Sequence, residues 1–166
     1  MRTKFTFLLF FLFSFTAFSQ QSFKLKQPNV KSLRLAVEKN EAVSTKLIQL
    51  FLDNNYKATS KKLDIKLDPD FDNKECGYTK KYEYGIVFTS FSCGEASPII
   101  KSIKFPKTNL SELKKWVENI YKADLTDVPN KWKGKHKYIP KDDGVGCYYT
   151  IKQTKTNSTI EIWCGC

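Results

Sequence analysis

Histidine is almost missing from this sequence, since His136 is the only one in 166 residues. General acid–base catalysis needs a base held by an orienting partner, so a single histidine offers few arrangements. The sequence also contains no glycine-rich phosphate loop, no serine nucleophile elbow and no His-Glu zinc pattern. Cys-x-x-Cys is lacking too, which argues against thiol redox catalysis. We therefore assign no catalytic residue, no metal site and no cofactor.

Long apolar runs are scarce, and the one that exists stands at the start of the chain. The basic lead Met1–Lys4 precedes residues 5–13, which are apolar except for one threonine, and the small residues Ala17 and Ser19 follow. This pattern is typical of a secretory signal peptide, whereas a membrane-spanning helix needs roughly 20 apolar residues. We expect residues 1–19 to be cleaved and the exported protein, periplasmic or extracellular, to begin at Gln20 without a membrane span.

Acidic residues are few relative to basic ones. The chain has 28 Lys and Arg against 17 Asp and Glu, a net charge of +11, and the leader contributes only two of the basic residues. An excess of this kind favours anionic partners. For an exported protein we expect an anionic glycan, a lipid head group or an acidic protein, because nucleic acid is a poor target outside the cell.

All five cysteines follow the leader, and an oxidising compartment would pair them. Five is an odd number, so at most two bridges form. The last two predicted strands place Cys147 opposite Cys164, with Cβ atoms about 4.5–5.5 Å apart, which is close to disulfide geometry. We expect Cys147–Cys164 and Cys76–Cys93, with Cys166 left over; Cys147–Cys166 is the alternative. A metal site at the C-terminal Cys-Gly-Cys is disfavoured by its narrow spacing and its lack of a second ligand pair.

Hydrophobic periodicity predicts one α+β domain over residues 30–166, preceded by a flexible segment at residues 20–29. Apolar residues recur at helical spacing over residues 30–52, as one helix or as two around Asn40-Glu41. A second helix is predicted over residues 110–121, with Asn109 as its cap.

Alternating or β-rich stretches predict strands at 62–68, 82–93, 99–105, 135–139, 145–151 and 159–164. In the first of these strands, Leu63, Ile65 and Leu67 are expected to face the core. The expected fold is α+β: a mainly antiparallel sheet of about five or six strands with two helical segments, stapled by disulfides.

A basic and aromatic stretch is the best candidate for binding. It combines four lysines at alternate positions with two rings and the histidine: Lys131, Trp132, Lys133, Lys135, His136, Lys137 and Tyr138. Cations and stacking rings together are typical of sites for single-stranded nucleic acid, and acidic sugars use the same mixture. The alternative is that these lysines lie on the wet face of an edge strand, where they discourage aggregation.

The sequence therefore favours a non-enzymatic exported binding or interaction domain for an anionic or protein partner. The alternative is a small secreted hydrolase that uses scattered carboxylates, or a pair formed by His136 and the odd cysteine. The Asp-rich segment 68–75 does not make a calcium loop, because Asn73 and Thr79 stand where an EF-hand needs glycine and glutamate.

Overall fold

The computed structural model describes residues 22–39, 46–95, 97–124 and 128–165. The predicted signal peptide, residues 1–19, and Cys166 lie outside these described residues. No helix in the four described segments is long and apolar enough to cross a membrane. The described helices are α1 (Val30–Glu38), α2 (Leu47–Asn55) and α3 (Leu110–Ala123). The described strands are β1 (Leu63–Asp68), β2 (Lys74–Lys81), β3 (Val87–Phe91), β4 (Ile99–Pro106), β5 (Asn130–Lys133), β6 (Lys137–Pro140), β7 (Gly146–Gln153) and β8 (Asn157–Gly165).

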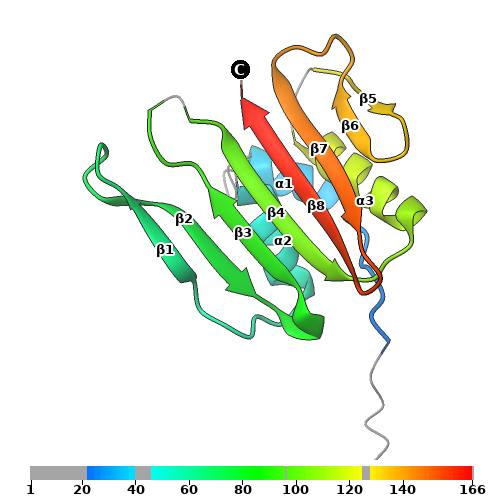
Figure 1. Ribbon diagram of the computed structural model, residues 1–166, viewed down its shortest axis with the longest axis horizontal. Helices are drawn as coiled ribbons and strands as arrows, with labels where there is room; N and C mark the ends of the chain where they lie inside the picture. Colours follow the sequence, from blue (N-terminus) through cyan, green and yellow to red (C-terminus); the bar gives the residue numbers. More distant parts are fainter. Residues whose placement is uncertain (1–21, 40–45, 96, 125–127, 166) are drawn as a thin grey trace, which may run out of the picture.

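The eight strands form one antiparallel sheet in the order β1-β2-β3-β4-β8-β7-β6-β5. Strands that follow one another in sequence are neighbours in the sheet, except that β4 pairs with β8 across the connection through α3. Figure 1 shows the three helices behind one face of this sheet, while the other face is left open. The two edge strands are therefore β1 and β5.

The prediction of about five or six strands and two helical segments is wrong, because the described chain has eight strands and three α-helices. Sequence reasoning misses β2 because its residues are mostly polar and its central Gly77 has no side chain to bury. The strand predicted over 82–93 is interrupted by Tyr84 and Gly85, both at positive φ, so that β3 is limited to Val87–Phe91 and Tyr82 forms only an isolated bridge with Ala58. The missed strand β5 is only four residues long.

The core joins the helices to the middle of the sheet through aromatic contacts. Asn109 caps α3 by accepting a hydrogen bond from the backbone N–H of Ser111 at 2.9 Å, as the capping pattern predicts. Trp116 of α3 is fully buried, with its ring centroid 5.7 Å from those of Phe51 on α2 and Phe105 on β4. This edge-to-face cluster fixes α2 and α3 against the sheet.

The segment before α1 is described from Ser22 onward. Leu25 is 5 % exposed and belongs to the core, and the backbone N–H of Lys26 donates to the Tyr56 hydroxyl at 2.9 Å. Phe23 lies against the rings of Tyr56 and Phe105. The described part of the segment 20–29 therefore packs onto the domain.

The C-terminal hairpin has the register that the sequence predicts, with Cys147 opposite Cys164 in the β7–β8 ladder. A disulfide joins these two cysteines, and a second joins Cys76 on β2 to Cys93 after β3. Both pairs are the ones expected from the sequence. The second bridge ties the loop that follows β3 to the neighbouring strand.

The apolar side chains of β1 are exposed, which corrects the expectation that they face the core. Leu63, Ile65 and Leu67 are 37, 50 and 55 % exposed. Two register shifts interrupt the pairing of β1 with β2, and Asp64 adopts φ 51°. Figure 1 shows the helices behind the centre of the sheet, so that they do not cover this edge.

Candidate functional site

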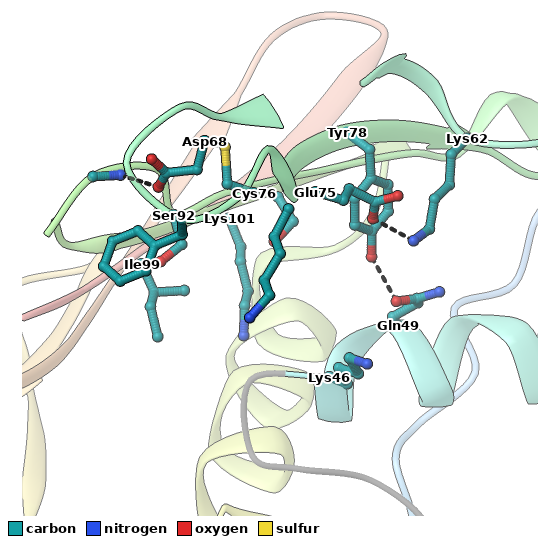
Figure 2. Close-up of a pocket in the computed structure, with 14 residues that line it drawn as sticks. Lys46, Gln49, Lys62, Asp68, Glu75, Cys76, Tyr78, Ser92, Ile99 and Lys101 are labelled. Atoms are coloured by element: carbon teal, nitrogen blue, oxygen red, sulfur yellow. Dashed lines mark hydrogen bonds and ion pairs between the residues drawn. The ribbon is translucent and has the colours of Figure 1, made fainter. Parts of the chain in front are cut away.

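An open cleft of about 690 Å³ lies on the helix side of the sheet, between strands β1–β4 and the start of α2 (Figure 2). Its floor is a row set by the sheet register, in which Tyr78 lies opposite Ser90 and Ser90 lies opposite Lys101. One pair further along β3 and β4, Phe88 and Ile103 are fully buried in the core. The cleft therefore opens where small or polar side chains replace large apolar ones. Its volume is in the range of small-molecule sites.

Lys101 is the central residue of this cleft. It lies on the inward face of β4 together with Ile99 and Ile103, and the whole residue is only 5 % exposed. Figure 2 shows its side chain extending from the sheet toward α3, with Lys46 at the start of α2 on the other side of the cleft. Among the described residues, the ammonium group has no ion-pair or hydrogen-bond partner. Burial lowers the pKa of Lys101 to about 8, and the Asp124 carboxylate acts in the opposite direction.

Further lysines make the cleft strongly positive. Lys46 and Lys74 line it and are exposed to solvent, and neither forms an ion pair within the described segments. Lys62 is different, because its ammonium is paired with Glu75 and lies 4.4 Å from the centroid of the Tyr78 ring. The cleft therefore holds more cations than its own carboxylates balance.

The second carboxylate of the cleft, Asp68, has a structural role. It is 4 % exposed and accepts hydrogen bonds from the backbone N–H groups of Gly94 at 2.5 Å and Asp70 at 3.1 Å. Gly94 has φ 92°, and a Cβ there would lie 2.9 Å from Ser97 Oγ, so glycine is required. Together with the adjacent disulfide at Cys93, these contacts form a fixed wall of the cleft.

Hydrogen bonds fix the position of α2 relative to the sheet. The Tyr78 hydroxyl donates to Gln49 Oε1 at 2.5 Å, and the Tyr82 hydroxyl donates to Asp53 Oδ1 at 2.8 Å. Burial, with the nearby carboxylates of Glu75 and Asp53, raises the pKa of Tyr78 to about 12. Tyr78 therefore stays a protonated donor at neutral pH, and this side of the cleft is held in place by both elements.

The side chains that line the cleft offer cationic and hydroxyl donors to an occupant. Its two carboxylates, Asp68 and Glu75, are already engaged, as described above. In the described residues no three His, Cys, Asp or Glu side chains gather as metal ligands, and the four described cysteines are all in disulfides. Ammonium groups and hydroxyls are the donors that charged oxygen atoms prefer.

The predicted basic and aromatic stretch lies elsewhere, on the β5–β6 hairpin at the far edge of the sheet from β1. Lys131 and Lys133 are on β5, Lys137 is on β6, and Lys135 and His136 lie in the turn between them. All five side chains are exposed. The Lys133 ammonium lies 3.4 Å from the Asp143 carboxylate, and both side chains are more than half exposed. Such surface ion pairs contribute little to stability.

The two rings of that stretch point away from solvent. Trp132 and Tyr138 have centroids 4.9 Å apart, and Tyr138 is only 8 % exposed. Trp132 Nε1 donates to Glu118 of α3 at 2.7 Å, while the Lys114 ammonium covers its ring at 4.4 Å. The rings therefore attach the hairpin to α3, apart from the exposed lysines. A binding role for the stretch stays a prediction.

Sequence reasoning misses Lys101, although a signal for it exists. Residues 99–105 alternate, and Lys101 has the same parity as Ile99, Ile103 and Phe105, which is the inward set. A lysine at an inward strand position is unusual, because lysine is almost never fully buried without a partner. The rest of the cleft comes from β1, β2, β3 and α2, and no local pattern connects these segments.

Comparisons with protein-family models, with curated proteins and with solved structures find no match to this chain. A fold does not by itself define a function, since one fold can carry many different sites. What the chain does is therefore inferred from the residues of the cleft.

Proposed function

We propose that this chain is an exported, non-enzymatic binding protein that holds an anionic ligand in the cleft between the sheet and α2. The observation that carries the proposal is the buried Lys101, which lines the cleft and forms no direct ion pair or hydrogen bond with a described residue, although the Asp124 carboxylate acts on its charge at longer range. A buried charge without a counterion is costly, so proteins normally pair it. A carboxylate or phosphate of the ligand would supply a counterion in direct contact with the ammonium group.

The surroundings of Lys101 support an anion of modest size. Lys46 and Lys74 lie at the cleft as further cations, and α2 begins there without a side-chain cap. Uncapped N–H groups at a helix start add positive partial charge. Phe71 and Ile99 also line the cleft and offer apolar contact. An acidic sugar unit and a phosphate-bearing lipid head group share this chemistry.

Export is part of the proposal. Two disulfides are present in the described chain, and disulfides persist mainly in oxidising compartments outside the cytosol. The apolar leader with its small-residue cleavage pattern supports the same location. Anionic glycans and lipid head groups are available in such a compartment.

Calorimetric titration tests the site with three probes: inorganic phosphate, glycerol 3-phosphate and glucuronate. We expect at least one probe to bind the parent protein, and its affinity to fall about tenfold or more in K101M, because the charge-assisted contacts are lost. K104M is the matched control, since Lys104 is on the same strand but exposed and outside the cleft. Phosphate and glucuronate separate the two possible sources of the anion. Failure of all three probes to bind the parent, or equal affinity for K101M, would contradict the proposal.

A further inference from the structure

The two edges of the sheet expose different kinds of side chain. At the β5 edge the strand is four residues long and carries exposed Lys131 and Lys133, which are devices that prevent strand pairing between molecules. At the β1 edge three apolar side chains, Leu63, Ile65 and Leu67, are exposed in succession. An exposed apolar edge strand is a template for pairing with another chain. β1 also carries Asp64, Lys66 and two register shifts, which limit pairing to a strand with a matching charge pattern.

The sequence of β1 is complementary to itself in the antiparallel direction. When two copies of β1 are centred on Ile65, Asp64 of each lies opposite Lys66 of the other, and Leu63 lies opposite Leu67. Directly opposite side chains have Cβ atoms about 4.5–5.5 Å apart and interact. A symmetric pair therefore gains two Asp–Lys contacts and an apolar row.

Another symmetric register lacks this complementarity. Centring the pair on Lys66 would place Lys66 opposite its own copy and Asp64 opposite Asp68, so that like charges meet. Like charges directly opposite each other destabilise a strand pair. Of these two registers the charge pattern favours the one centred on Ile65, and it makes β1 complementary to a second copy of this chain.

We propose that two copies of this chain associate through antiparallel pairing of their β1 strands centred on Ile65. The pairing is isologous, so the sheet continues across a two-fold axis. Only residues 63–67 take part, because Asp68 is buried and hydrogen-bonded to Gly94. This inference does not rest on the cleft or on its ligand.

The geometry of β1 sets the strength of this association. Asp64 is at φ 51° in the isolated chain, a left-handed conformation that costs an L-residue free energy, although aspartate tolerates it. The proposed register requires Asp64 to become extended, and this change of conformation reduces the free energy of association. Because the ladder is short and irregular next to β2, we expect weak, concentration-dependent dimers rather than a permanent assembly.

Sedimentation velocity over a concentration series tests the pairing by charge reversal. We expect D64K and K66D each to weaken self-association about tenfold or more, since each variant places two like-charge contacts in the symmetric pair. An equimolar mixture of D64K and K66D should recover association, because every contact between the two variants again joins opposite charges. I65K should abolish association, whereas K133D at the other edge should leave it unchanged.

Recovery in the mixture is the decisive result, because a general loss of folding in either variant could not produce it. Thermal melting of each variant, compared with the parent protein, checks that all of them fold. A parent protein that stays monomeric at every concentration would overturn the inference. So would a mixture of D64K and K66D that associates no better than either variant alone.

Discussion

Lys101 lies at an inward position of β4, where the alternation of the strand predicts an apolar side chain. Its neighbours on the inward face are apolar: Ile99 is partly buried and Ile103 is fully buried. The ammonium group of Lys101, in contrast, lines the cleft. Burial lowers the pKa of Lys101 to about 8, so the group is still largely charged at neutral pH. The folded protein therefore carries a destabilising charge that a bound anion would compensate.

Replacing Lys101 with methionine should stabilise the protein near neutral pH. The folded pKa of about 8 lies below the ordinary value of 10.5, so between these pH values the unfolded chain binds more protons. The parent protein therefore gains stability, relative to K101M, as pH rises through this window. Below it we expect K101M to be more stable by about 3 kcal/mol. Denaturant unfolding of both proteins at about pH 7 and about pH 9.5 measures this difference.

A constant difference across that pH range would contradict the buried-charge account. The comparison with K101M is needed because tyrosines also titrate at high pH, and their contribution is the same in both proteins. K104M again serves as the control, since its exposed lysine should leave the pH dependence unchanged.

Ligand affinity should depend on pH through the same group. An anion binds the ammonium form of Lys101. This form predominates well below the pKa of about 8, and it is lost as pH rises above that value. We expect the probe affinity of the parent protein to be level below this pH and to fall by up to about tenfold per unit above it. Titrations of glycerol 3-phosphate or glucuronate at several pH values test this, and an affinity that is unchanged above pH 8 would contradict it.

At the scale of elements, the sequence predicts a helix or hairpin correctly where the residues that determine it are close together in the chain. The cap and apolar stripe predict α3, and alternation with a turn predicts the β7–β8 register and its disulfide. They fail for β2, β5 and the orientation of β1, because these strands lie toward the sheet edges. Near an edge, a side chain is buried only if a neighbouring strand or helix packs against it, and the local sequence does not show this.

The two disulfides should have equal effects on stability but different effects on the cleft. Each closes a loop of the same length, with a sequence separation of 17, so removal of either should cost about 3 kcal/mol. Only Cys76–Cys93 borders the cleft. We expect C76S/C93S to lose probe affinity as well, whereas C147S/C164S keeps it. Chemical unfolding and calorimetry of both double variants measure the two effects, and equal affinities would show that the bridge does not shape the site.

At the scale of the whole molecule, the leader leads to the prediction of export and the composition to that of an anionic ligand, and both stay predictions. The cleft could not be predicted in the same way, because its residues come from five elements that only the fold brings together. The predicted basic stretch shows the converse: its lysines and rings are adjacent in sequence but separate on the β5–β6 hairpin. In this protein, residues that are adjacent in sequence do not form one site, and the residues that form the cleft are distant in sequence.

The mature protein should begin at Gln20 and carry one free thiol. Cleavage after residue 19 removes the apolar leader, and two bridges use four of the five cysteines. Intact mass spectrometry of the exported protein, with thiols alkylated before and after reduction, measures both. A retained leader, or five alkylated thiols without reduction, would contradict export through an oxidising compartment.

The most direct test of the central claim is an NMR titration of Lys101, with its side-chain signal assigned by comparison with K101M. In the free protein we predict a pKa of about 8 for this lysine. When glycerol 3-phosphate or glucuronate is added, its pKa should rise, because a bound anion stabilises the ammonium form. A Lys101 that titrates at the ordinary value of 10.5 and does not respond to phosphate, glycerol 3-phosphate or glucuronate would contradict the account.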